Sequence, residues 1–187
     1  MRRTLYFGYG SNLWLAQMKS RCPHSTYLGV GRLKGYRWQI MERGYANVVE
    51  SDCADESEDY ENVVYGLIYN LTASDEENLD INEGVPYAYK KEAHSVDFWA
   101  AKSSEHKVDV RNKPKKKDML VYIDHERTKD SKPLEEYIVR MNHGIDDALA
   151  VGVPKKYIDQ VLRKSIPAIK EEDVSQTLQD KGSKPCR

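Results

Sequence analysis

The 187-residue sequence contains no apolar run that approaches the roughly 20 residues needed to cross a membrane as a helix. It also lacks an excess of charge of either sign, because 29 Lys and Arg residues balance 30 Asp and Glu residues, for a formal net charge of −1. Such a balance gives no overall field that would favour nucleic acid or a membrane surface. The first residues lead directly into a β-type run, without the apolar stretch of a secretory signal peptide. These absences favour a cytoplasmic protein with no nucleic-acid and no membrane partner.

Cysteine is scarce: the chain has only Cys22, Cys53 and Cys186, an odd number at wide spacing. This set is typical of reduced thiols in a reducing compartment and not of a disulfide framework. Cys22 and His24 could form half of a metal site, but no second pair lies at ligand spacing. We therefore expect no metal and no other cofactor.

Short runs rich in tyrosine, tryptophan and valine predict strands along the first two thirds of the chain. The expected ranges are residues 4–7, 25–30, 36–41, 46–50, 63–71, 88–100 and 118–124. The run 63–71 is almost continuously apolar, which indicates a central strand buried on both faces. Apolar residues at helical spacing predict a helix over residues 134–149 and another that has Pro154 at its first position.

Two shorter helices are expected earlier in the chain. Asn12 would cap a helix over residues 13–19, and a capping box at residues 74–77, with Ser74 as its N-cap, would open a helix that runs to about Asn82. Residues 50–62 are acidic and residues 111–117 basic, and both are expected to form exposed loops. This order of strands and helices predicts an α+β fold, with one domain over residues 1–167 and a polar, flexible tail over residues 168–187.

The most informative segment follows the first expected strand and reads Tyr6-Phe7-Gly8-Tyr9-Gly10-Ser11-Asn12-Leu13. Two glycines two residues apart, followed by Ser-Asn, allow a tight turn that presents backbone N–H groups to an anion or a carbonyl oxygen. Leu13 stands where a dinucleotide-binding loop has its third glycine, and no Gly-Lys-Ser/Thr follows as in a Walker loop. The loop therefore matches neither kind of nucleotide site.

Glu83 stands at the expected end of the second short helix, directly before Gly84-Val85-Pro86. Its neighbours in the sequence include Ile81, Tyr87 and Tyr89, which would withdraw the carboxyl group from water and raise its pKa towards neutrality. Such a group can act as a general acid and base. The residues alone leave open a second interpretation, a helix-end glutamate in water.

Together, the two segments resemble the γ-glutamylcyclotransferase family, in the branch whose YGSN loop is followed downstream by an acidic residue in a Glu-Gly-Val context. The resemblance covers roughly residues 4–167. It implies a small, mixed, barrel-like sheet with a few flanking helices, and places the glycine loop and the acidic residue at one mouth. It also implies an enzyme that cyclises a γ-glutamyl amide or peptide to 5-oxoproline and releases an amine or amino acid. Its partner would be a small-molecule substrate, and a homodimer is left open.

The resemblance also implies roles for individual residues. Glu83 would be the catalytic acid and base, and Tyr122 would reach the substrate from its strand. The loop would bind the γ-glutamyl group through its backbone, with Asn12 shaping the turn; the substrate-binding residues are Tyr6, Phe7, Gly8, Tyr9, Gly10, Ser11 and Asn12. Asn12 also separates the chain from the glutathione-specific branch, which typically has Leu directly after the serine. The leaving group and the pathway stay undetermined.

Two other functions fit the sequence. A protein on the same scaffold could bind γ-glutamyl compounds without turnover, although a pure binder would not need a desolvated Glu83. Alternatively, Ser11 or Cys22 could be the nucleophile of an amide hydrolase, which would release glutamate instead of 5-oxoproline.

Overall fold

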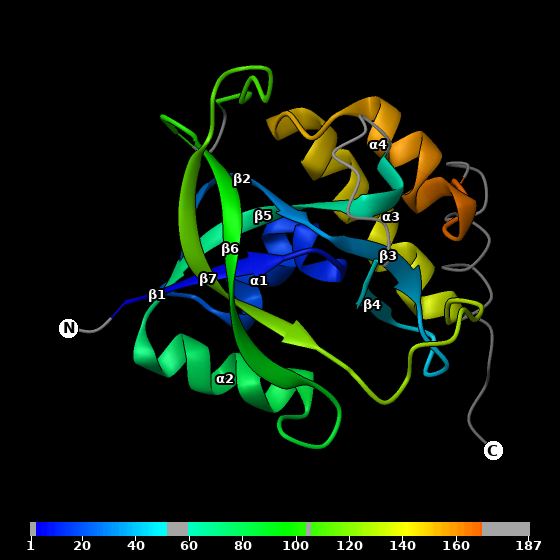
Figure 1. The fold of residues 1–187 in the computed structure, drawn as a ribbon. Helices are drawn as coiled ribbons and strands as arrows, with labels where there is room; N and C mark the ends of the chain where they lie inside the picture. Colours follow the sequence, from blue (N-terminus) through cyan, green and yellow to red (C-terminus); the bar gives the residue numbers. More distant parts are fainter. Residues whose placement is uncertain (1–2, 52–59, 104–105, 170–187) are drawn as a thin grey trace, which may run out of the picture.

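The computed structural model describes residues 3–51, 60–103 and 106–169 (Figure 1). A closed barrel forms its centre, with the strand order β1-β5-β2-β6-β7. The barrel strands are β1 (Thr4–Gly8), β2 (Thr26–Lys34), β5 (Val63–Leu71), β6 (Lys90–Ala100) and β7 (Lys115–Ile123). β1 pairs with β7 in parallel, whereas the other barrel pairs are antiparallel. The expected α+β fold with a mixed, barrel-like sheet is confirmed.

The apolar run 63–71 forms β5 over the predicted range. β5 lies between β1 and β2, and both of its faces are covered. On the inner side, the Phe7 ring fills the space beside Gly66; on the outer side, the rings of Tyr65 and Tyr157 lie 5.1 Å apart. A strand covered on both sides explains the absence of polar alternation in this run.

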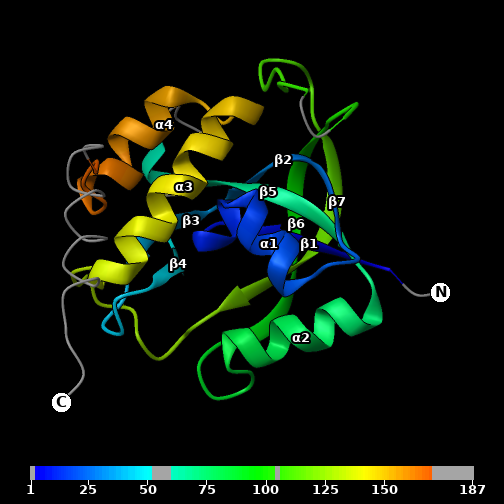
Figure 2. The same ribbon diagram turned by 180° about the vertical axis from the view of Figure 1, so that it is seen from behind.

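The remaining elements lie outside the barrel. β3 (Tyr36–Ile40) and β4 (Ala46–Glu50) form a separate hairpin, and η2 (Tyr60–Asn62) precedes β5. The helices are α1 (Leu15–Arg21), α2 (Ala73–Glu83), α3 (Glu135–Val151) and α4 (Lys155–Gln160), which is followed by η3 (Leu162–Lys164). α2 lies below the barrel in both views, on the side away from α3 and α4 (Figures 1 and 2).

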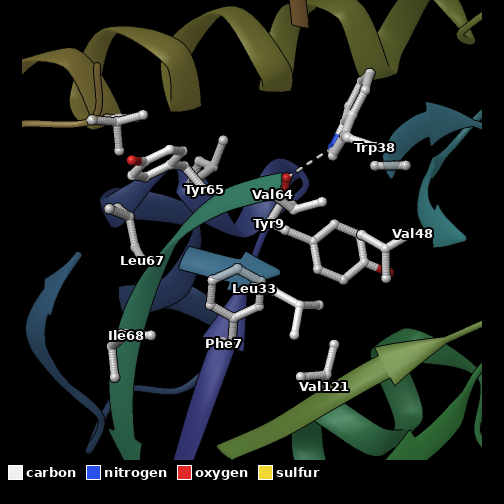
Figure 3. Close-up of a cluster of buried hydrophobic side chains, with 14 of the residues drawn as sticks. Phe7, Tyr9, Leu33, Trp38, Val48, Val64, Tyr65, Leu67, Ile68 and Val121 are labelled. Atoms are coloured by element: carbon white, nitrogen blue, oxygen red, sulfur yellow. Dashed lines mark hydrogen bonds between the residues drawn. The ribbon is translucent and has the colours of Figure 1, made fainter. Parts of the chain in front are cut away.

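The buried core anchors the glycine loop. Phe7 is fully buried, and its ring lies beside Leu33 in the barrel (Figure 3). Tyr9 follows at the point where β1 has ended, and the Trp38 Nε1–H group donates a hydrogen bond to its carbonyl oxygen at 3.0 Å (Figure 3). The β3–β4 hairpin therefore fixes the loop from one side.

Three local predictions, on Asn12, on Pro154 and on the basic loop, are wrong. Asn12 does not cap α1: it lies inside the 3₁₀ turn η1 (Ser11–Leu13), and α1 begins after Trp14. Pro154 is the N-cap of α4 and not its first residue, because its ψ of 127° is extended. The last three residues of the expected basic loop, 115–117, pair with β6, since their exposed side chains leave the backbone free to bond across the strands.

Two expectations fall largely outside the described residues. These are the loop at 50–62, of which residues 52–59 are not described, and the tail, which is not described from residue 170 onward.

Candidate active site

A cavity of about 400 Å³ opens where β1 ends. Segments distant in the sequence form its wall, among them the loop after β1, the C-terminal end of α2, the turn between β3 and β4, and α3. Tyr9, Gly10, Ser11 and Glu83 all line it. The structure therefore brings together the glycine loop and the acidic residue that the sequence singles out.

α2 delivers Glu83 to this cavity as its last residue. The helix is capped by Thr72, whose Oγ1 accepts a hydrogen bond from the Asp75 N–H group at 3.1 Å, while Asp75 accepts from the Thr72 N–H group. The predicted cap at Ser74 is wrong, because the chain enters the helix two residues earlier. Gly84 ends α2 in the left-handed conformation, at φ 66°, which glycine adopts without a steric penalty.

Glu83 is half-buried, and its surroundings favour the neutral form of its carboxyl group. Burial raises the pKa of Glu83, and the positive charges of Arg21, Arg140 and Arg43 together with a hydrogen bond from Asn12 offset only part of this effect. The Asn12 Nδ2–H group donates that bond to Oε1 of Glu83 at 3.1 Å. The direction expected from the sequence is confirmed.

The residues expected to desolvate Glu83 are only partly the right ones. Ile81 and Tyr87 are 79% and 88% exposed, whereas Tyr89 is buried. The Tyr6 and Tyr9 rings, which come from the distant loop, are buried and line the same cavity. Neighbours in sequence around a helix end point in different directions, so proximity in the chain does not identify what covers the carboxyl group.

Asn12 does more than shape the turn. The residue is 4% exposed, and its Nδ2 atom donates to the Tyr6 hydroxyl at 2.8 Å as well as to Glu83. Its Oδ1 atom accepts from Gln17 Nε2 at 2.9 Å and from an Arg21 guanidinium nitrogen at 3.1 Å. Because every polar atom of the amide is engaged, the Asn12 side chain is held rigidly against Glu83.

Three hydrogen-bond donors of residues that line the cavity have no acceptor among the described residues. The Tyr137 hydroxyl oxygen accepts bonds from the N–H groups of Ser11 at 3.1 Å and Ala46 at 3.3 Å. A hydroxyl has two acceptor lone pairs and one proton, and this proton has no acceptor among the residues with described positions. The backbone N–H groups of Gly10 and Asn12 also lack an acceptor within that part of the chain.

Gly10 is required for this arrangement. A Cβ atom at Gly10 would lie 2.6 Å from the Tyr137 hydroxyl oxygen and 3.1 Å from Cβ of Ala46. Only glycine therefore allows the loop to approach Tyr137 so closely.

Three of the predicted substrate-binding residues occupy other roles in the fold. Tyr122 lines the cavity, but its hydroxyl donates to Oδ1 of Asp80 at 2.6 Å. Phe7 and Gly8 are not part of the wall: the Phe7 ring lies inside the barrel, and Gly8 is paired opposite Leu67. Of the predicted loop residues, Tyr6 and the stretch from Tyr9 to Asn12 reach the cavity.

The two candidate nucleophiles differ in position. Ser11 lines the cavity, and its Oγ atom accepts bonds from Gln17 Nε2 and Arg140, both at 3.0 Å. Cys22 is fully buried outside the wall, and burial raises the pKa of its thiol to about 12. A thiol with this pKa is not ionised at neutral pH and is therefore a poor nucleophile.

Sequence reasoning missed the cavity's cations and its central tyrosine. Arg21, Arg43 and Arg140 line the wall from α1, the β3–β4 turn and α3, and Tyr137 precedes Arg140 by less than one helical turn. The helical spacing of Tyr137 and Arg140 was a weak signal that they share a face, but no local motif marked the two other arginines.

Within residues 3–51, 60–103 and 106–169, no group of three His, Cys, Asp or Glu side chains is placed to hold a metal ion. No helix in the same ranges is long and apolar enough to span a membrane.

Comparisons with known proteins agree with this fold. Residues 6–137 match the model of a family described as gamma-glutamyl cyclotransferase, AIG2-like. A solved gamma-glutamyl cyclotransferase is similar with a TM-score of 0.67 and 19% identity, over 96% of this chain and 99% of the other. An uncharacterized protein from Homo sapiens is similar with a TM-score of 0.67 and 20% identity, over 94% and 98% of the two chains.

YkqA from Bacillus subtilis has a TM-score of 0.64 and 18% identity, over 91% of this chain and 56% of its own. At these identities the likeness concerns the fold alone. Comparison with curated protein sequences finds no match.

Proposed function

The chain belongs to the AIG2-like gamma-glutamyl cyclotransferase family, and we propose that it cyclises a γ-glutamyl amide or peptide to 5-oxoproline, with release of the amine or amino acid. One observation carries the proposal. Glu83, whose pKa is raised by burial, lines the same cavity as Gly10 and Asn12, whose backbone N–H groups have no acceptor among the described residues. A base and a set of oxyanion donors are what such a cyclisation needs.

In the proposed complex, the loop from Tyr9 to Asn12 holds the γ-glutamyl group. Its α-carboxylate and its γ-carbonyl oxygen are both acceptors, and the free donors of the wall are N–H groups and the Tyr137 hydroxyl. The substrate chain is then folded back on itself, with the α-amine close to the γ-carbonyl carbon. Such an arrangement favours an intramolecular attack, because the entropy of bringing the two groups together has been lost on binding.

Glu83 acts first as the base. Its ionised carboxylate accepts a proton from the α-ammonium group, and the neutral amine attacks the γ-carbonyl carbon to close a five-membered ring. A raised pKa brings Glu83 closer to the pKa of the group it deprotonates, which favours the transfer.

The tetrahedral intermediate carries its negative charge on the former γ-carbonyl oxygen. The N–H groups of Gly10 and Asn12 and the Tyr137 hydroxyl are the candidate donors to this oxyanion. Glu83 gives its proton to the leaving nitrogen and accepts the second proton of the attacking nitrogen, and the scissile C–N bond breaks as the carbonyl group re-forms. Glu83 then passes this proton to the released amine, which leaves as an ammonium ion, so the carboxylate is regenerated for the next cycle.

The two alternatives receive less support from the geometry. Cys22 is buried away from the cavity, and the described wall contains no histidine that could activate Ser11 as a base. A binder without turnover would have no use for the raised pKa of Glu83, since ionised carboxylates bind cationic ligands more strongly than neutral ones.

The test is a substrate panel with product analysis. The protein is incubated with γ-glutamyl dipeptides, γ-glutamylamines, glutathione and an α-glutamyl dipeptide, and the products are separated by chromatography. We expect 5-oxoproline from at least one γ-linked compound and none from the α-linked control, whose amine cannot form a five-membered ring with the scissile carbonyl. Release of free glutamate without 5-oxoproline would favour the hydrolase, and binding without any product would favour the binder.

A further inference from the structure

We propose that Arg43 selects substrates whose leaving group carries a carboxylate, so that γ-glutamyl amino acids and peptides are preferred over γ-glutamylamines. This inference rests on the proposed cyclotransferase function and names its substrate class. Arg43 lies in the turn between β3 and β4 and lines the same cavity as the glycine loop and the end of α2.

The cavity wall has more positive than negative charge. Three arginines, Arg21, Arg43 and Arg140, line it, and among the described wall residues Glu83 is the one carboxyl group. The charges of all three guanidinium groups offset part of the rise that burial causes in the pKa of Glu83. A cavity of this kind attracts an anionic molecule.

Two of these arginines are already engaged. Arg140 forms an ion pair with Glu136 at 2.8 Å and donates to Ser11 Oγ at 3.0 Å, and its guanidinium lies 5.0 Å from the centre of the Tyr137 ring. Arg21 donates to Oδ1 of Asn12 at 3.1 Å. Both therefore serve to hold the loop, which leaves their charge only partly available to a ligand.

Arg43 differs from these two arginines in its contacts. Its guanidinium lies 5.7 Å from the centre of the Tyr45 ring, and neither an ion pair nor a hydrogen bond joins its side chain to any residue in the described part of the chain. The half-buried Tyr45 ring is a platform that orients the guanidinium without using its N–H groups. All five N–H donors of Arg43 are thus free to bind an acceptor.

The charges of the substrate indicate what that acceptor is. A γ-glutamyl group carries one α-carboxylate and one α-ammonium group, so by itself it leaves the positive charge of the wall uncompensated. A leaving group that is an amino acid adds a second carboxylate, whereas a leaving amine adds none. Arg43 can bind that carboxylate through two parallel hydrogen bonds, which give both affinity and orientation.

The experiment compares γ-glutamylalanine with γ-glutamylethylamide, which differs by loss of the leaving-group carboxylate. The rate of 5-oxoproline formation gives kcat/KM for the wild type, for Arg43→Gln and for the control Arg37→Gln. Arg37 is in the same hairpin, is paired with Asp130 at 3.6 Å and does not line the cavity, so its loss removes the same charge elsewhere.

We expect the wild type and Arg37→Gln to prefer γ-glutamylalanine by about five- to tenfold, the scale of a partly exposed charge-assisted pair. In Arg43→Gln this ratio should fall to about one. The inference is overturned if Arg43→Gln lowers kcat/KM equally for both substrates, since Arg43 would then bind the shared γ-glutamyl group. It is also overturned if the wild type does not prefer the carboxylated substrate.

A binding measurement separates this inference from the proposed reaction. The same two ligands are titrated by calorimetry into Glu83→Gln and into the double variant Glu83→Gln/Arg43→Gln. Tighter binding of γ-glutamylalanine that depends on Arg43 would support the inference even if no 5-oxoproline formed, in which case the proposed function alone would fail. Turnover without any Arg43-dependent preference in Kd would keep the proposed function and reject the inference.

Discussion

The two ends of α2 carry carboxyl groups with opposite properties. Asp75, in the first turn, has a fully buried side chain, and Glu83, the last residue, is half-buried at the cavity. Burial would raise the pKa of both. For Asp75, hydrogen bonds from Thr72 and His24 outweigh that effect and lower the pKa, whereas for Glu83 the pKa stays raised.

The difference lies in the number and placement of the donors. Asp75 accepts bonds from the Thr72 hydroxyl at 2.8 Å, the Thr72 N–H group at 3.3 Å and the His24 N–H group at 3.2 Å. Glu83 accepts one from Asn12 at 3.1 Å and lies at the negative end of the helix dipole. Burial alone therefore does not raise the pKa of a carboxyl group; the pKa is raised when the buried carboxyl group also accepts few hydrogen bonds.

The largest effect is expected on turnover. Glu83→Gln keeps the shape of the side chain but removes the proton acceptor, so 5-oxoproline formation should fall by about 10²- to 10⁴-fold. Asp75→Asn makes the matching carboxyl-to-amide change on the same helix and should leave the turnover per folded molecule within a few-fold of the wild type. The measurement is the initial rate of each variant, normalised to its folded fraction. Equal losses of rate in the two variants would contradict the assignment of Glu83, and not Asp75, as the catalytic carboxyl group.

The order of the two variants should be reversed in the free energy of unfolding, where Asp75→Asn is expected to have the larger effect. Asp75→Asn leaves buried donors without an ionised acceptor and is expected to lower the free energy of unfolding by about 1–3 kcal/mol. Glu83→Gln should not lower it at neutral pH. Urea denaturation followed by circular dichroism measures both, and a larger loss in Glu83→Gln would contradict the assignment of Asp75 as the structural carboxylate.

Local features of this comparison could be predicted from the sequence. β5 and the Glu-Gly ending of α2 follow from an apolar run and from a glycine that stops a helix, both of which depend on adjacent residues. The YGSN string likewise identified the loop, because its turn is determined by residues next to one another.

The side chains that surround Glu83 could not be predicted from its neighbours in the sequence, although the family resemblance implied that the glycine loop lies close to it. Tyr6, Asn12 and Arg140 reach it from segments about 60 to 80 residues away in the chain, and only the closure of the barrel and the packing of α3 bring them there. The sequence predicts the cap of α2 at Ser74 instead of Thr72, because both positions allow the same local bonding and the strand before the helix decides where it begins.

A smaller effect is expected in the pH dependence of the rate. Since burial raises the pKa of Glu83 above its ordinary value of 4.5, the base is lost at a higher pH than for a glutamate in water. The acidic limb of kcat/KM should therefore lie above pH 4.5. A limb at or below that value, measured with a substrate that does not titrate there, would show that Glu83 is not the base or is not desolvated.

The smallest effect is expected in the pH dependence of stability, to which Glu83 and Asp75 should contribute with opposite signs. A raised pKa in the folded state means that Glu83 destabilises the protein as pH rises from its unfolded-state pKa through its folded-state pKa. For Asp75, whose pKa is lowered, stability is gained over the corresponding rise in pH and is lost in acid. Between mildly acidic and neutral pH, the midpoint of thermal unfolding should therefore increase for Glu83→Gln relative to the wild type, and no such relative increase should occur for Asp75→Asn.

The most direct measurement of the central claim is the fate of solvent oxygen in the product. The wild type is incubated in H₂¹⁸O with γ-glutamylalanine or with its N-acetylated form, and the products are analysed by mass spectrometry. Attack by the substrate's own amine predicts unlabelled 5-oxoproline and alanine from the first compound and no reaction of the second, whose amine is blocked. Incorporation of ¹⁸O into a released glutamate or N-acetylglutamate would show that water is the final acceptor of the acyl group, and would contradict cyclisation.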